Sequence, residues 1–169
     1  MNVILVEGES DRLALEALAR RRERDLDAED VSIHAIGGAH AIRREVERLH
    51  EHARLAGLCD AQEKPHFRKA FEAVGLADRF FVCERDLEDE LIRALGVAAV
   101  EEVLVARHEL GLFRSFQQQR AWRGRDPAEQ LRRFFGTYSH RKIEIGAMLV
   151  NALDLDRVPR PLDGVLAAV

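Results

Sequence analysis

The segment Asn2-Val-Ile-Leu-Val-Glu-Gly-Glu-Ser-Asp11 opens the sequence and decides how the rest of it is interpreted. Its first part, Asn2–Val6, is a short apolar run of the kind found in a strand that is buried on both faces. Beyond it, apolar side chains recur at helical spacing, so we predict that Ser10 caps a helix from Asp11 to about Arg22. A buried strand, a tight turn and an amphipathic helix together indicate an α/β unit.

The alternation of strand and helix continues as far as Cys83. Further strands are predicted at Val31–Ile36, Leu55–Cys59 and Phe80–Cys83, with helices between them at about Ala39–His52 and Pro65–Val74. Gly75 is the expected stop of the last of these helices. We therefore expect an α/β fold with a Rossmann-like parallel four-stranded sheet flanked by helices.

Only helical patterns occur after this region. They cover Leu87–Leu95, Ala98–Leu110, Phe113–Gln119, Pro127–Phe135, Lys142–Leu153 and Leu162–Ala168. The polar stretch Arg120–Asp126 is predicted to be a loop. We expect an α/β core over residues 1–95 and a helical C-terminal extension over residues 96–169, packed on the core as a single domain overall.

The composition excludes several classes of protein. The 169 residues are 47% hydrophobic and 33% charged, which is typical of a globular domain and not of a disordered or fibrous chain. No apolar run approaches the roughly 20 residues of a membrane span. The first residues lack a basic segment and a cleavage site, so we expect no signal peptide. Cys59 and Cys83 form neither a disulfide nor a metal-binding pattern. We expect a cytoplasmic protein with no membrane partner.

Acidic residues follow three of the four predicted strands. They are Glu7 and Asp11 after the first strand, Asp60 after the third, and Glu84, Asp86 and Glu88 after the fourth. Ligands of an open parallel sheet bind beyond the carboxyl ends of its strands, so these acids would gather where function is expected. Because converging carboxylates repel one another, a hard divalent cation such as Mg²⁺ or Mn²⁺ is the simplest partner, and it would serve phosphate chemistry.

Each acid also has a structural alternative. Asp11 could complement a helix dipole, and Asp60 and Asp86 could cap the helices that follow them. Glu88–Glu90 could form a solvated helix face. Taken singly, the acids favour these alternatives; their joint placement at one sheet edge favours a metal site.

In their order along the chain, several segments resemble the Toprim (topoisomerase–primase) domain, and most closely the Toprim domains of OLD (overcoming lysogenization defect) family endonucleases. The resemblance rests on Glu7–Asp11, Gly37-Gly38, Leu58–Asp60, Asp86–Glu88 and Arg141-Lys142. It implies a Toprim fold and a Mg²⁺/Mn²⁺-dependent nuclease that nicks or cleaves nucleic acid. By the same resemblance, Glu7, Asp11, Asp60 and Glu88 bind the metal, Glu7 is also a catalytic acid or base, and Lys142 faces the scissile phosphate.

Two departures from the family pattern weaken the expectation of catalysis. The second aspartate of the Toprim Asp-x-Asp pair is replaced by Gln62, although Glu63 could act as an additional metal ligand. No phosphate-loop motif occurs, so we expect a freestanding domain without the ATPase of OLD proteins. The alternative functions are a catalytically weak or inactive Toprim module that binds a separate ATPase or nucleic-acid-processing partner, and hydrolysis of a small phosphoester.

A basic stretch near the C-terminus suggests a surface for nucleic acid. Residues 107–142 contain nine Lys or Arg against three acids. The predicted contacts are Arg120, Trp122, Arg123, Arg125 and Arg141, with DNA favoured over RNA. Burial is the alternative for Trp122, whereas the phenylalanines of this stretch are assigned to the helix core.

Overall fold

The computed structural model describes residues 1–137 and 139–169, without the side chains of Ala39 and of residues 139–142. Its centre is a parallel four-stranded sheet in the order β2-β1-β3-β4. The strands are β1 (Asn2–Val6), β2 (Val31–Ala35), β3 (Arg54–Cys59) and β4 (Phe80–Val82). The α/β fold class expected from the sequence is confirmed.

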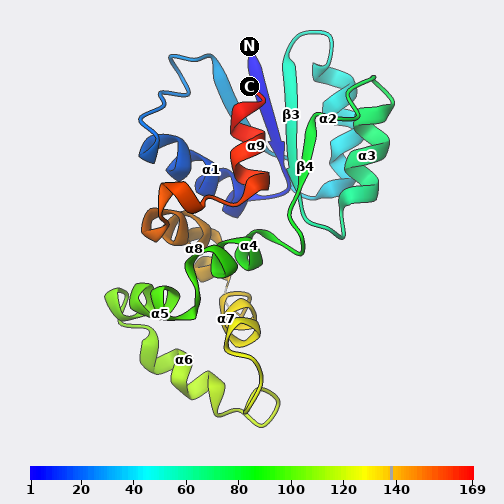
Figure 1. Ribbon diagram of the computed structural model, residues 1–169. Coiled ribbons are helices and arrows are strands. Elements are labelled where there is room, and N and C mark those ends of the chain that lie inside the picture. Colours follow the sequence, from blue (N-terminus) through cyan, green and yellow to red (C-terminus); the bar gives the residue numbers. More distant parts are fainter. Residues whose placement is uncertain (138) are drawn as a thin grey trace.

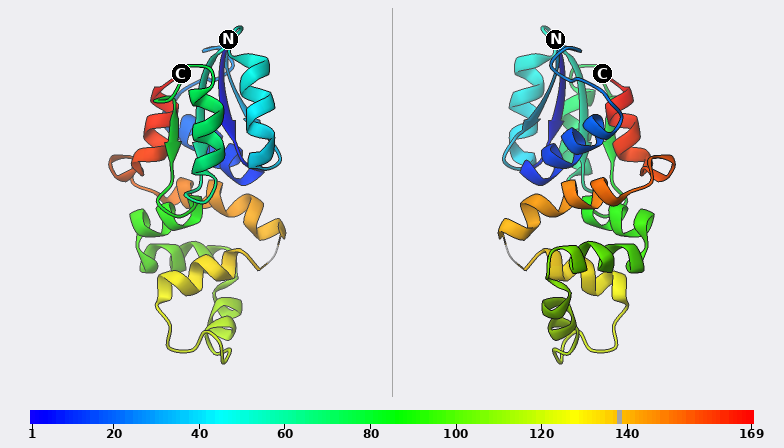
Figure 2. Two further views of the ribbon diagram at one scale, coloured as in Figure 1. Left: turned by 90° about the vertical axis from the view of Figure 1, so that its right-hand side faces the viewer. Right: turned by 90° about the vertical axis from the view of Figure 1, so that its left-hand side faces the viewer.

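Helices cover both faces of the sheet (Figure 1). One face carries α2 (Ile42–Leu49) and α3 (Lys64–Glu72), and the other carries α1 (Glu9–Arg21) and α9 (Arg160–Ala167). Helix α8 (Ser139–Ala152) lies beyond the carboxyl ends of the strands and packs on α1 and α4 (Figure 2). The remaining helices, α4 (Leu87–Leu95), α5 (Val97–Ala106), α6 (Leu110–Gln117) and α7 (Pro127–Phe135), follow one another beyond the carboxyl ends of the strands. Short 3-10 helices occur at Ala39–Ala41 and Leu155–Arg157. None of the helices in the described part of the chain is long and apolar enough to cross a membrane.

The first strand explains the two-sided packing. Val3 and Leu5 join the hydrophobic cluster under α2 and α3, whereas Ile4 and Val6 join the larger cluster under α1. All four side chains are fully buried, so the strand needs apolar residues at every position instead of the alternation typical of a half-exposed strand.

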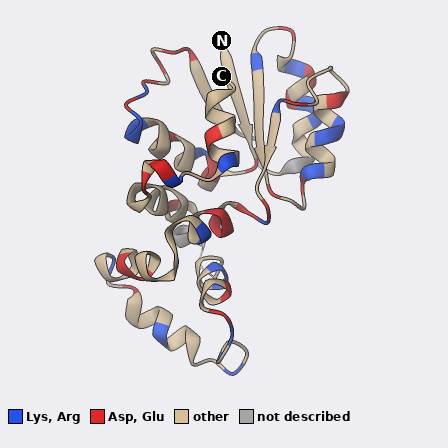
Figure 3. Ribbon diagram, in the orientation of Figure 1, with Lys and Arg blue, Asp and Glu red and all other residues tan. Residues whose placement is uncertain are grey.

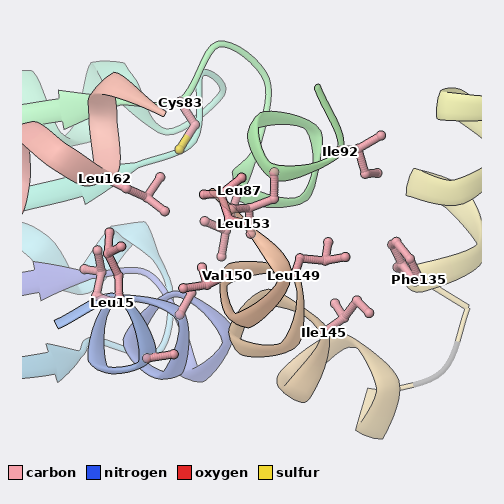
Figure 4. Packing of buried hydrophobic residues seen from close by; sticks show 14 of the residues in the cluster. Leu15, Cys83, Leu87, Ile92, Phe135, Ile145, Leu149, Val150, Leu153 and Leu162 are labelled. Atoms are coloured by element: carbon pink, nitrogen blue, oxygen red, sulfur yellow. The ribbon is translucent and has the colours of Figure 1, made fainter. Parts of the chain in front are cut away.

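The larger cluster continues out of the sheet into the C-terminal helices. Leu149 and Val150 of α8, and Leu153 just after it, belong to the same buried cluster as Leu15 of α1 and Leu87 of α4 (Figure 4). Gly146 permits this close packing, because a Cβ there would lie 3.3 Å from the Ala14 Cβ. Thus α8 connects α1, which covers the sheet, to the helices beyond the strand ends.

The segment expected as an extension contains two kinds of structure. Helices α5–α7 project from the sheet as a helical lobe, whereas α8 packs along α1 and α9 returns to β3 and β4 (Figure 2). At Gly164 of α9, an added Cβ would lie 2.5 Å from the ring of Phe81 in β4, so the helix rests directly on the strand.

Two local predictions are wrong. The first helix begins at Glu9 with Gly8 as its N-cap, so Ser10 is inside the helix and does not cap it. The helix expected over Ala98–Leu110 ends at Ala106, and the one expected from Phe113 already begins at Leu110, because the chain turns at His108, whose φ is 59°.

Candidate metal and nucleic-acid site

Four of the predicted site residues line a single pocket at the carboxyl edge of the sheet. Its volume is about 470 Å³, and its acidic walls include Glu7, Asp11, Asp60 and Glu88. These residues come from the end of β1, the first turn of α1, the end of β3 and the first turn of α4. The structure therefore brings together acids that are separated by up to about 80 positions in the sequence.

Glu7 ties three strand ends together. Its carbonyl oxygen accepts hydrogen bonds from the N–H groups of Gly37 and Gly38, each at 3.1 Å. Its Oε1 accepts a hydrogen bond from the backbone N–H of Asp60 at 2.7 Å. The two glycines have φ of 73° and 118°, a backbone region that other residues rarely adopt. The glycine pair after β2 therefore lets the loop fold over the Glu7 carbonyl.

Asp11 also has a structural role. Its Oδ2 accepts a hydrogen bond from the N–H of Gly8 at 3.0 Å, which satisfies a backbone donor at the start of α1. The bond fixes the carboxylate at the rim of the pocket. Asp11 therefore both stabilises the start of helix α1 and lines the pocket.

Glu88 is positioned by the cap of its own helix. Asp86 accepts a hydrogen bond from the N–H of Asp89 at 2.9 Å, so the predicted capping role of Asp86 is confirmed. Only 9% of Glu88 and 8% of Glu90 is exposed, so the structural alternative of a solvated helix face at Glu88–Glu90 is wrong for these two acids. Glu88 instead lines the pocket.

Glu90 is a buried structural acid that the sequence did not reveal. It accepts a hydrogen bond from the N–H of Glu84 at 2.7 Å and pairs with Arg93 at 3.0 Å. It therefore fixes the connection between β4 and α4 from inside the fold.

Burial and the negative charge of the pocket change the pKa of Asp60. Burial, and then the negative charges of Glu7, Asp11, Asp86 and Glu88, raise the pKa of Asp60 to about 8. Without a cation, the Asp60 carboxyl group therefore retains a proton at neutral pH. A divalent cation would offset the same repulsion.

The chemistry of these residues fits a hard cation, although their present arrangement is open. Among the described residues, no three His, Cys, Asp or Glu side chains are grouped closely enough to hold a metal ion. The carboxylates would therefore have to turn toward a shared ion. Oxygen donors on four separate elements, beside a space of about 470 Å³, are suitable for Mg²⁺ or Mn²⁺ with several retained waters.

Several other predicted site residues lie elsewhere. Gln62 is exposed, and neither it nor Glu63 lines the pocket; Glu63 stands before α3, 3.9 Å from His66. The side chains of Arg141 and Lys142 are outside the described residues. The structure therefore places neither of these two basic groups relative to the carboxylates.

The loop at Arg120–Asp126 is confirmed, and three of its arginines are exposed: Arg120, Arg123 and Arg125. Trp122 is half-buried, with its ring centroid 5.4 Å from that of Phe116 and 5.3 Å from the Arg125 guanidinium. The buried Gln130 donates a hydrogen bond to the Trp122 carbonyl at 2.7 Å. Trp122 therefore anchors the loop to the helical lobe and leaves the arginines at the surface.

A parallel sheet with acids at its carboxyl edge is an arrangement that the Toprim fold shares with other α/β folds. Residues 1–54 match the family described as "Overcoming lysogenization defect protein-like, TOPRIM domain". A search of curated proteins found no match. The resemblance to the Toprim domain of OLD proteins is therefore confirmed for the segment that contains Glu7, Asp11 and the glycine pair.

Solved structures extend the likeness in fold to the whole chain. The C-terminal region of the Xanthomonas campestris pv. campestris OLD protein has a TM-score of 0.74 at 22% identity, covering 99% of this chain and 91% of that one. The C-terminal region of the Burkholderia pseudomallei OLD protein has a TM-score of 0.71 at 14% identity, covering 99% and 95%. The sheet and the helical lobe thus share the fold of OLD C-terminal regions.

Proposed function

We propose that this chain is a Mg²⁺- or Mn²⁺-dependent nuclease that nicks or cleaves nucleic acid by hydrolysing a phosphodiester bond. The observation that carries the proposal is the single pocket that Glu7, Asp11, Asp60 and Glu88 line. The confirmed resemblance over residues 1–54 supports it. DNA is favoured over RNA as the substrate.

The roles of the residues follow from their positions and from the resemblance. Asp11, Asp60 and Glu88 would hold the cation, with Glu63 as an additional ligand if the loop after β3 moves. Glu7 would contribute a ligand or transfer a proton to or from the attacking water. When bound, the cation would polarise a phosphoryl oxygen. Lys142 would stabilise the negative charge that develops on the phosphate.

Plasmid nicking tests the proposal directly. Purified protein should convert supercoiled plasmid to the open-circular form with Mn²⁺ or Mg²⁺, and Glu7→Gln should abolish the activity. Glutamine keeps an oxygen that can accept the Asp60 N–H hydrogen bond, so the fold should persist. Glu72→Gln, which changes an exposed acid on α3, is the matched control. Absence of cleavage of any DNA or RNA by the unmodified protein would overturn the proposal.

The second candidate is a catalytically weak or inactive Toprim module that binds a separate ATPase or nucleic-acid-processing partner. It is favoured by Gln62, which is exposed and outside the pocket, and by the open arrangement of the carboxylates. Calorimetry that detects no Mn²⁺ binding, together with co-purification of an identified ATPase, would support this candidate over the nuclease. The cytoplasmic location expected from the sequence stays a prediction.

A further inference from the structure

A second pocket continues from the carboxylate pocket toward the helical lobe. Its volume is about 290 Å³, and it shares Glu88 and Gly136 with the carboxylate pocket. Its other walls come from the start of α4, from α7 and from the loop before α7, and consist of Asp86, Trp122, Glu129, Arg132 and Arg133. The two pockets together therefore form a groove from the acids to the arginine-rich loop.

Ion pairs within the fold occupy most of the charges in this second pocket. Arg132 donates a hydrogen bond from Nε to Oδ2 of Asp86 at 2.6 Å. Glu129 is paired with Arg85, which lies at the turn before α4. Arg133 is exposed and makes no ion pair with any residue that the structure describes. It is the basic group of the pocket that can accept an outside anion.

Another basic surface flanks the sheet, on α3. Lys64, Arg68 and Lys69 line a pocket of about 340 Å³ there, but it shares no residue with the carboxylate pocket. Figure 3 shows Lys and Arg on α3 beside the sheet, whereas the helical lobe lies beyond the carboxyl ends of the strands. The continuity of the walls favours the α7 side as the path of a ligand that reaches the acids.

We propose that nucleic acid bound at the carboxylate pocket extends along α7, and that Arg133 binds a backbone phosphate next to the reacting one. The exposed Arg120, Arg123 and Arg125 would bind phosphates farther along the same path. This proposal rests on the proposed nuclease function and adds the direction in which the nucleic acid leaves the carboxylate pocket. The helical lobe is then the arm that holds the substrate on one side of the site.

Hydrogen bonds within the loop hold two of these arginines in place. Arg123 and Arg125 donate hydrogen bonds to the carbonyls of Gln118 and Ala121, at 3.1 Å and 2.8 Å. These bonds hold the guanidinium groups near the loop backbone without neutralising their charge. A fixed, uncompensated cation loses less conformational entropy when it binds a phosphate.

Binding of labelled duplex DNA across a salt series, in buffer without divalent ions, tests the path. Arg133→Ala should weaken binding about three- to tenfold, and Arg133→Glu should weaken it further. The slope of log K against log salt should become shallower by about 0.9 in Arg133→Ala, because the variant neutralises one phosphate fewer. Arg68→Ala, which removes an exposed arginine from α3, should bind like the unmodified protein.

The outcomes separate this proposal from the nuclease function. Thermal unfolding should be unchanged in Arg133→Ala, because the side chain is exposed. If Arg133→Ala and Arg133→Glu bind DNA normally, or if Arg68→Ala loses as much affinity as Arg133→Ala, the path is wrong, even when the unmodified protein nicks plasmid. If the Arg133 variants lose affinity as expected but the unmodified protein does not nick with Mn²⁺, the path holds and the nuclease function fails.

Discussion

Nε of Arg132 lies 2.6 Å from Oδ2 of Asp86, so helix α7 holds the cap of the helix that carries Glu88. The interaction connects the lobe to the carboxylate pocket in two steps, from Arg132 to the Asp86 cap and from the cap to the first turn of α4. The hydrogen bond to Asp86 raises the pKa of Arg132. The pair is partly buried, with 33% of the Arg132 side chain and 16% of the Asp86 side chain exposed.

Arg132→Ala should therefore lower the free energy of unfolding by about 1–2 kcal/mol. It should also weaken Mn²⁺ binding, because the first turn of α4 loses its support. Chemical denaturation and calorimetry measure the two effects. The control is Arg85→Ala, which breaks an exposed ion pair with Glu129 and should change stability by less than about 1 kcal/mol. Equal effects of the two variants on Mn²⁺ binding would contradict a special role for Arg132.

The raised pKa of Asp60 gives a pH-dependent stability. In the unfolded chain this carboxyl loses its proton near pH 3.8, whereas in the metal-free folded protein it keeps the proton to about pH 8. The unfolded state therefore binds fewer protons between these values, and the contribution of Asp60 to stability falls as the pH rises through them. Asp60→Asn should be increasingly more stable than the unmodified protein from pH 4 to pH 8 in EDTA. If the melting temperatures of the two proteins change with pH in parallel, the pKa of Asp60 is not raised in the folded protein.

Glu88 and Glu90 should separate binding from stability. Glu88→Gln should lose Mn²⁺ affinity with little loss of stability, because Glu88 lines the pocket. Glu90→Ala should lower the free energy of unfolding by about 1–3 kcal/mol, because the N–H of Glu84 loses its acceptor and Arg93 loses one partner. Calorimetry at a temperature where both variants are folded should show near-normal Mn²⁺ binding by Glu90→Ala. If Glu88→Gln loses stability and Glu90→Ala loses Mn²⁺ affinity instead, the roles assigned to Glu88 and Glu90 are wrong.

Gln62→Asp restores the sequence of the Toprim Asp-x-Asp pair without placing an acid in the pocket. Residue 62 is exposed and does not line the pocket, so the new carboxylate should change the Mn²⁺ dissociation constant by less than about twofold. Calorimetry measures the change directly. A large gain in affinity would mean that the loop after β3 folds inward when the cation binds.

A substitution at Gly146 tests the close packing of α8 on α1. Gly146→Ala places a Cβ 3.1 Å from Cδ2 of Leu87 and 3.3 Å from the carbonyl oxygen of Ser10, so it should destabilise the fold by about 1–2 kcal/mol. Gly111→Ala is the matched control, since an added Cβ meets nothing within 4 Å in α6. This control should stabilise the protein by about 0.5–1 kcal/mol. Urea denaturation of both variants gives the comparison.

The sheet was predictable because its strands are marked by local sequence. Buried strands such as Asn2–Val6 require apolar residues at every position, and the acids after them fall at the edge where parallel strands end. The convergence of Glu7, Asp11, Asp60 and Glu88 on one pocket agrees with that reasoning. Their roles as metal ligands stay predictions.

Other features depend on contacts that a local pattern does not contain. The turn at His108 interrupts an apolar helical pattern without a glycine or proline, and its place is set by packing of α5 and α6 on other helices. Glu90 has the sequence context of a surface acid, in a run of charged residues at the start of a helix. Its partners, the backbone N–H of Glu84 and the side chain of Arg93, are contacts of the folded chain. The pairing of Arg132 with Asp86 joins positions 46 residues apart and carries no spacing signal.

The return of α9 to the sheet brings the two ends of the chain to the same side of the molecule, away from the carboxylate pocket (Figures 1 and 2). A short flexible linker between residues 169 and 1 should therefore allow circular permutation, with new termini opened in the Arg120–Asp126 loop. Such a permutant would leave every strand intact while cutting the arm proposed to hold the substrate. The permutant would therefore show whether the α/β core still folds when the arm proposed to hold the substrate is interrupted.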